Sequence, residues 1–388
     1  MNTAVTEVGG ASNWERLETA ACPRCGSLDG RNVAEGRDYL YGVPGRFFAW
    51  QCNACGLQYQ NPRPTAERLP QLYPASYGPH ASKLPGETAS PSLSWKERVK
   101  RHKMVSRVWP ILRTGRAGLR SLCRRTGVGL FYPDPAELEC FLRGEMGYSH
   151  LQCQHYEPEK PLSQQMRREC RRLAGIELVP HYVSDGRLLE IGCAKGDRLQ
   201  FYRERGWVHL NGIELAEQAA KQAEQRGFRV ACEPVESALE RFSIGSFDVV
   251  VSSMVLEHLH NPFTVMRSIA GKLKPGGEFL FSTVTLDSLD ARMFGPYWSG
   301  YDFPRHMVYF RMTDIRDMLA KDFDLTECFH QNAPLDFLRP ATWRRSEGRI
   351  SDRMIASLAK SSARLWVGDL LARMGQTSRV SFRCRKKQ

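Results

Sequence analysis

The chain has 388 residues, of which 42% are hydrophobic and 25% are charged, and its formal net charge is +13. This length allows two or three domains, and the composition is ordinary for a globular protein. Without an apolar run of 18 residues we expect no transmembrane helix, and the first residues lack the basic and apolar regions of a secretory signal.

Two C-x-x-C-G pairs mark the first structured region, residues 18–78, after a tail at 1–17 that we expect to be disordered. The pairs are separated by 26 residues and consist of Cys22, Cys25, Cys52 and Cys55. Four thiolates in two tight turns suit a tetrahedral zinc ion, and they leave no open position for chemistry. We therefore predict a zinc ribbon with a structural Zn²⁺ and a β-hairpin between the pairs. Four free thiols or a redox pair are the alternatives, and each of these interpretations points to a reducing, cytoplasmic compartment.

A linker rich in Pro, Gly and Ser is expected at residues 79–95, followed by a basic and helical region at 96–185. Residues 96–125 carry eleven Lys and Arg against one acid, Glu97, with apolar residues between them. Such a pattern suits an amphipathic helix on anionic lipid, which would place the protein peripherally at the inner membrane face. A solvated charged helix that covers the catalytic domain is the favoured interpretation.

Alternating strands and helices begin near residue 186 and define a domain at 186–388. Strands are predicted at 187–192, 209–214, 228–232, 247–252, 278–283, 324–330 and 379–385, and helices at 197–206, 216–226 and 262–273. This alternation predicts an α/β fold with a doubly wound, mostly parallel sheet of seven strands. Lys274–Gly277 is expected to be a turn. An insert is expected at 331–376. Within it, residues 350–375 are expected to form an amphipathic helix, which would pack into the core, cap the pocket or make a dimer contact.

A glycine turn follows the first of these strands, with the spacing Glu190-x-Gly192-x-x-x-Gly196. The second strand ends at Glu214, an acid placed to accept hydrogen bonds from a ribose, as in sites for NAD and for S-adenosylmethionine. The dinucleotide fingerprint needs a further glycine where the chain approaches the pyrophosphate. Here Cys193 and Ala194 occupy that stretch, which disfavours a dinucleotide.

Four motifs in order resemble those of class I S-adenosylmethionine-dependent methyltransferases of the quinone and small-molecule type. They are "LLEIGCAKG", "IEL", "FDVVVSSMVLEHL" and "LKPGG", with Ala194 in place of the family's middle glycine. Residues 52–77 are similar to the N-terminal segment of bacterial methyltransferases that begin with a zinc ribbon, and residues 294–310 resemble a segment after strand five of the same group. The resemblance implies a Rossmann-like domain that binds S-adenosylmethionine.

The resemblance also implies the residues of the cofactor site. Those that would wrap the methionine end are Gly192, Cys193, Ala194 and Gly196, with Glu190 ordering the turn. Glu214 would hold the ribose and Leu215 would pack on the adenine, with Val235 and Glu236 at its edge. Ser253 and Met254 would lie beside the sulfonium.

Two histidines near these motifs, His258 and His306, are candidate bases for deprotonating an acceptor hydroxyl. Local hydrogen bonding or indirect support is the alternative for each. Candidate walls of the acceptor pocket are Tyr297, Trp298, Tyr301, Asp302 and Arg305, with Arg305 expected to pair with a carboxylate or phosphate. The alternative is a lid that packs over the sheet without touching substrate. Glu257 and His258 by themselves are too few ligands to predict a metal site.

The leading functional hypothesis is a methyltransferase that acts on a small or lipid- or nucleotide-linked acceptor, by O- or C-methylation, for example of a sugar or secondary metabolite. Its partners would be a small-molecule or carrier-linked acceptor, and an oligomer is compatible with the sequence. One alternative is an RNA methyltransferase that grips nucleic acid with the ribbon and the basic segment. Strand four ends in "SSMV" rather than a motif of base-amine methylation, which disfavours it. The other is a non-catalytic zinc-ribbon scaffold.

Overall fold

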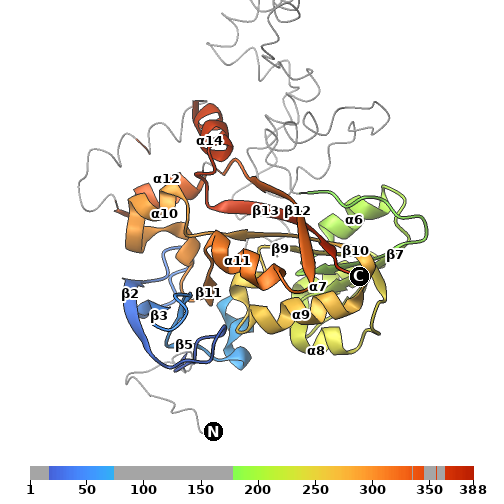
Figure 1. Cartoon of the computed structure of the whole chain (residues 1–388), viewed down its shortest axis with the longest axis horizontal. Helices are drawn as coiled ribbons and strands as arrows, with labels where there is room; N and C mark the ends of the chain where they lie inside the picture. The colour runs from blue at the N-terminus through green and yellow to red at the C-terminus, as the bar shows by residue number, and fades with distance from the viewer. Residues whose placement is uncertain (1–16, 74–177, 334, 345–354, 356–362) are drawn as a thin grey trace, which may run out of the picture. The chain divides into compact units, whose positions relative to one another are not determined.

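The computed structural model describes residues 17–73, 178–333, 335–344, 355 and 363–388 (Figure 1). The basic segment 96–125 and most of the helical region around it lie outside these residues, as do the linker at 79–95 and part of the amphipathic stretch at 350–375. The predictions for them stay predictions. The described residues belong to one compact unit, which contains both the N-terminal cysteine pairs and the α/β domain.

The α/β domain is built on a seven-stranded sheet, as predicted. Its order is β12-β13-β10-β9-β6-β7-β8, and β13 runs antiparallel to both of its neighbours while the other described pairs are parallel. The strands are β6 (Arg187–Ile191), β7 (His209–Ile213), β8 (Arg229–Ala231), β9 (Phe247–Ser253), β10 (Leu273–Val284), β12 (Phe323–His330) and β13 (Arg379–Lys386). Each predicted strand is present. The central strands β6, β9 and β10 are largely buried, as apolar runs in a sheet covered by helices are.

One sequence expectation needs correction at the start of β10. Lys274–Gly277, expected to be a turn, lies within β10, where the pairing with β9 shifts register between Leu273 and Glu278. Gly276 has φ +73° in this irregularity, a conformation that glycine adopts without a steric penalty. The strand therefore starts at the end of helix α9 (Pro262–Lys272) with no separate connection.

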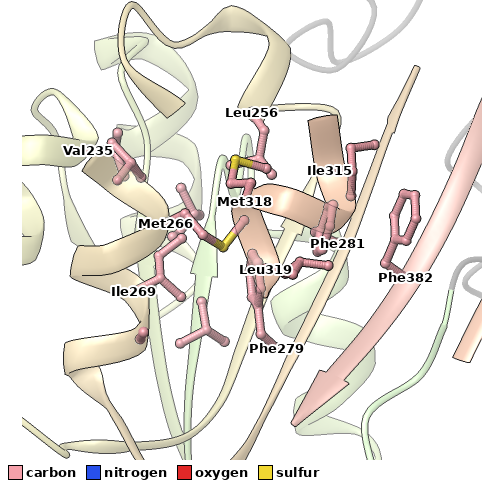
Figure 2. Packing of buried hydrophobic residues seen from close by; sticks show 14 of the residues in the cluster. Val235, Leu256, Met266, Ile269, Phe279, Phe281, Ile315, Met318, Leu319 and Phe382 are labelled. Atoms are coloured by element: carbon pink, nitrogen blue, oxygen red, sulfur yellow. The ribbon is translucent and has the colours of Figure 1, made fainter. Parts of the chain in front are cut away.

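Helices alternate with the strands and carry the apolar core. They are α6 (Asp197–Arg203), α7 (Glu217–Gln225), α8 (Val235–Glu240), α9, α10 (Leu289–Phe294), α11 (Met312–Leu319), α12 (Leu335–Trp343) and α14 (Ala363–Arg373). Figure 2 shows Met266 and Ile269 of α9 beside Met318 and Leu319 of α11, against Phe279 of β10. No helix in the described part of the chain is long and apolar enough to span a membrane.

The N-terminal region forms a second, four-stranded sheet with the order β11-β4-β3-β2. Its antiparallel hairpin, β2 (Gly30–Gly36) and β3 (Phe47–Cys52), connects the two cysteine pairs as predicted. β4 (Gln58–Gln60) continues the sheet, and the short strands β1 (Leu17–Glu18) and β5 (Arg63–Pro64) pair beside a 3-10 helix, η1 (Ala66–Leu72).

The last strand of this small sheet, β11 (Val308–Tyr309), comes from the α/β domain rather than from the N-terminal region. Val308 pairs with Tyr59, and both side chains are fully buried in the core that also contains Phe279 and Ile315. The cysteine-containing sheet and the α/β domain therefore share one hydrophobic core.

Candidate active site

The glycine turn between β6 and α6 adopts a backbone that requires glycine at two positions. Gly192 and Gly196 have φ +75° and +81°. A Cβ atom on Gly192 would lie 2.5 Å from the Val255 side chain, and one on Gly196 would lie 2.9 Å from the Phe228 ring. Ala194 is also left-handed, with φ +45°, so this non-glycine residue accepts a strained conformation at the middle of the turn.

Glu214, directly after β7, holds this turn in place. Its carboxylate accepts hydrogen bonds from the backbone N–H groups of Ala194 and Ala216, each 2.8 Å long, and the residue is buried. The carboxyl ends of parallel β6, β7 and β9 meet at one edge of the sheet, where ligands bind in open α/β folds. The structure therefore brings the predicted turn and the predicted ribose ligand together, and the cofactor contacts themselves stay a prediction.

Beneath the turn, the predicted ordering residue Glu190 has a partner that sequence reasoning missed. Arg198 of α6 places its guanidinium 3.4 Å from the Glu190 carboxylate, and both side chains are buried. Arg198 directly precedes the buried Leu199 near the start of α6. This position could have suggested the pair, because a buried cation needs an anion.

The other predicted cofactor residues follow the carboxyl ends of the strands and differ in how exposed their side chains are. Cys193 is buried, Leu215 is half-buried and Glu236 is exposed. Val235 packs into the core on α8, as Figure 2 shows. Ser253 makes a 2.9 Å hydroxyl–hydroxyl hydrogen bond to Ser282, and Met254 (φ +53°) donates its backbone N–H to the Ser282 carbonyl.

The two candidate histidines meet although 48 positions separate them in the sequence. Their ring centroids are 4.4 Å apart in an edge-on arrangement. His258 lies in the 3-10 helix η3 (Leu256–His258), and its Nδ1 is 2.9 Å from the Tyr73 hydroxyl and 3.1 Å from the Arg305 carbonyl. Burial, followed by the nearby His306, lowers the pKa of His258 to about 3, so His258 is neutral at neutral pH.

Tyr73 is a site residue that sequence reasoning did not identify. It follows η1 of the cysteine-containing region, 185 positions before His258, and no local pattern connects the two. The N-terminal region therefore contributes a side chain directly to the candidate active site.

The aromatic segment 294–310 packs between the two sheets rather than standing open to solvent. Trp298 is buried, and its indole N–H donates to Asp290 over 2.9 Å. Tyr301 stacks on Phe303 at 5.2 Å between ring centroids, and the half-buried Tyr297 lies 5.6 Å from Tyr39 of the N-terminal region. The segment is therefore packed against the fold, and its role as a wall of the acceptor pocket stays a prediction.

Arg305 does not have the arrangement expected for an acceptor ligand. Its guanidinium is fully buried and makes a two-pronged pair with Asp38, at 2.7 and 2.8 Å, and a further 2.7 Å contact with Asp302. Burial alone would lower the pKa of Arg305, but these carboxylates raise it, so the cation is permanent. Arg305 is committed to two carboxylates of the chain, and its predicted pairing with a carboxylate or phosphate of the acceptor is corrected accordingly.

The four predicted zinc ligands converge. The Sγ atoms of Cys22, Cys25, Cys52 and Cys55 lie within 4.8 Å of one another. Gly26 and Gly56 have φ +77° and +75°, and each donates its N–H to the carbonyl of the first cysteine of its pair over 2.9 Å. The two turns are therefore equivalent, as a pair of zinc-binding knuckles requires.

The described sheet, with its order and its antiparallel β13, has the Rossmann-like fold of class I S-adenosylmethionine-dependent methyltransferases, as predicted. The glycine turn is held by an acid at the end of the next strand. Residues 162–327 match the model of a family described as a methyltransferase domain.

Comparison with curated proteins finds ubiquinone biosynthesis O-methyltransferases. The chain is 30% identical over 157 residues to that of Bordetella avium, covering 39% of this chain and 61% of the relative. It is 33% identical over 119 residues to that of Idiomarina loihiensis, covering 29% and 48%. The chain thus spans about three fifths or less of the length of these relatives.

Among solved structures, the chain is similar to phosphoethanolamine N-methyltransferase 2 of Haemonchus contortus in complex with S-adenosyl-L-methionine. The TM-score is 0.37 at 19% identity, and the match covers 54% of this chain and 50% of the other.

Proposed function

We propose that the protein transfers the methyl group of S-adenosylmethionine to a hydroxyl oxygen of a small acceptor, free or carrier-linked. The observation that carries this proposal is the placement of the glycine turn and Glu214 at the sheet edge where β9 leads into His258. Oxygen is favoured over carbon because the curated relatives are named O-methyltransferases.

Bound S-adenosylmethionine supplies an electrophilic methyl group on a sulfonium, and the transfer is an in-line displacement. The chain has to hold the acceptor oxygen in line and exclude water. The oxygen forms its bond to the methyl carbon as the carbon–sulfur bond breaks. We place the acceptor hydroxyl beside His258 and His306 and propose His306 as the base that takes up its proton, because the lowered pKa of His258 makes that imidazole a weak base.

We also propose that the cysteine cluster holds a structural Zn²⁺. Four sulfur donors on two equivalent turns fit a tetrahedral ion, and they leave no position open to a substrate. The ion would fix the sheet that carries Asp38 and Tyr73 toward the active site, so its contribution to the reaction is indirect.

The cofactor site is tested by Glu214→Gln, which removes the charge that accepts two backbone N–H groups. A charge-assisted hydrogen bond contributes about 1.5–3 kcal/mol. Its loss should weaken the binding of S-adenosylmethionine about 10- to 100-fold. Isothermal titration measures this affinity. Glu217→Gln is the matched control, because Glu217 is exposed and pairs with Lys221. Equal affinities in the two variants would place the cofactor elsewhere.

The reaction itself is tested with methyl-labelled S-adenosylmethionine and a panel of phenolic and sugar hydroxyls, free and carrier-linked, together with bulk RNA. We expect label on a small hydroxylated acceptor and none on RNA. Label on RNA, or cofactor binding without transfer to any hydroxyl, would contradict the proposed acceptor.

A further inference from the structure

We propose that Glu257, His258 and His306 form a second metal site, distinct from the cysteine cluster, for a divalent transition-metal ion. A carboxylate oxygen and one imidazole nitrogen from each histidine lie within 4.8 Å of one another. Two of these residues follow β9 and the third lies just before β11, so only the folded chain assembles the set.

Glu257 provides the strongest indication of a cation site. Its side chain is fully buried, and Oε2 accepts a 2.9 Å hydrogen bond from the Thr283 hydroxyl. Oε1 is also buried, yet it has no hydrogen-bond partner among the residues that the structure describes. A buried carboxylate oxygen without a partner is costly, and a bound cation would satisfy it.

The two histidines present the geometry of metal ligands. Nδ1 of His306 is 2.8 Å from the Gly300 carbonyl, and Nδ1 of His258 is 3.1 Å from the Arg305 carbonyl. A carbonyl can only accept, so the Gly300 contact places the ring hydrogen of His306 on Nδ1 and leaves its lone pair on Nε2. Nδ1 of His258 also contacts the Tyr73 hydroxyl at 2.9 Å, and a hydrogen on this nitrogen is compatible with both contacts when the hydroxyl accepts. Metal-binding histidines are commonly oriented by such a hydrogen bond from the other nitrogen.

The backbone around the cluster keeps the three side chains together. The Glu257 carbonyl accepts the N–H of Met307 over 2.7 Å, which joins η3 to the residue after His306. A further carboxylate near the cluster is Asp302, whose Oδ2 lies 3.8 Å from Nε2 of His306 and which is engaged with Arg305.

The donor set indicates both the ion and its role. Two imidazoles and one carboxylate bind Zn²⁺ or Fe²⁺, and three protein ligands leave positions open for an outside oxygen. In this arrangement the histidines act through the ion. A bound ion would polarise an acceptor hydroxyl and lower its pKa, and Glu257, His258 and His306 would then serve as ligands of the ion rather than as bases. This role rests on the proposed function, whereas the binding of the ion does not.

The site is tested by metal content in the full-length protein, loaded with Zn²⁺ and freed of excess ion. We expect two equivalents per chain in the unmodified protein and one in Glu257→Gln, whose amide keeps the shape but is a poor ligand. Cys52→Ser should lose the other equivalent. Asp290→Asn is the matched control, because Asp290 is a buried carboxylate outside the cluster, and it should keep both equivalents.

Cobalt substitution distinguishes the two sites by a second readout. Thiolate-to-cobalt absorption should persist in Glu257→Gln and His306→Gln, while the weaker absorption of a nitrogen- and oxygen-bound ion disappears. A single equivalent in the unmodified protein, or two in both variants, would overturn the second site. If the protein binds two equivalents but methyl transfer is unchanged after the ion at Glu257, His258 and His306 is removed, the site exists but has no role in the reaction. Failure to bind S-adenosylmethionine would instead refute the proposed function.

Discussion

At the scale of single residues, Ala194 shows how the cofactor turn differs from the family pattern. Its φ of +45° is a conformation that costs an alanine roughly 1–2 kcal/mol relative to the right-handed region. The N–H of Ala194 is bonded to Glu214, and this contact holds the residue in that conformation.

Ala194→Gly should leave the affinity for S-adenosylmethionine intact, with stability changed by about 1 kcal/mol or less, because relief of strain is offset by the entropy of glycine. Ala194→Leu should abolish binding, since a large side chain at this turn would occupy the cofactor space. Isothermal titration measures the affinity of both variants. Normal binding by the leucine variant would show that the cofactor does not lie against this turn.

At the scale of elements, one buried cation fastens the aromatic segment to the N-terminal hairpin region. Arg305 pairs with Asp38 of the loop after β2 and with Asp302 of its own segment. Asp38 also accepts backbone N–H groups from Leu40, Tyr41 and Val43, so it orders the loop at the same time. The segment that carries His306 is thereby fixed to two different parts of the fold.

Asp38→Asn should lower the free energy of unfolding by about 3 kcal/mol, the lower end for breaking a buried ion pair, because Asp302 still compensates the guanidinium. Arg305→Met should cost more, since it leaves two buried carboxylates without a cation. Urea unfolding measures both. Equal stability of Asp38→Asn and the unmodified protein would mean that the pair contributes no net stability.

The same pair predicts a pH dependence. Burial alone would raise the pKa of Asp38, but the hydrogen bonds and charge of Arg305 lower it below its ordinary value of 3.8. A lowered pKa in the folded state stabilises the protein above the unfolded-state value, and this contribution is lost as the pH falls through the folded-state pKa. The stability difference between the unmodified protein and Asp38→Asn should therefore shrink below pH 3.8. A difference that stays constant would show that Asp38 does not titrate with folding.

At the scale of the whole molecule, the cysteine-containing sheet and the methyltransferase core behave as one folding unit. Leu57 and Tyr59 are fully buried in the same core as Met307 and Phe310. On the outside, Arg24 of the first cysteine pair bonds to Asp314 and Asp317 of α11. Loss of the ribbon would expose this apolar surface and remove Tyr73 from His258.

Cys52→Ser, or removal of zinc with a chelator, should therefore unfold more than the ribbon, because structural zinc contributes folding free energy directly. We expect a lower Tm, a single transition and weakened binding of S-adenosylmethionine. Cys328→Ser is the control, because Cys328 lies on β12 outside the cluster. An unchanged Tm in Cys52→Ser would show that the ribbon is not needed for the fold.

The sequence by itself determined the features that are encoded locally. The seven strands, the glycine turn with Glu214, and the hairpin between the cysteine pairs all follow from apolar runs, turn residues and fixed spacings. Each of these signals acts over a few tens of residues at most, which is the range within which a pattern can be read along the chain.

Only the tertiary structure decided how distant groups are paired. Asp38 meets Arg305 across 267 positions, Tyr73 meets His258 across 185, and β11 completes a sheet that begins in the N-terminal region. The third ligand beside Glu257 and His258 comes from a segment 48 positions after His258. Such contacts depend on burial and charge compensation in the folded core, and no spacing in the sequence specifies which buried cation meets which anion.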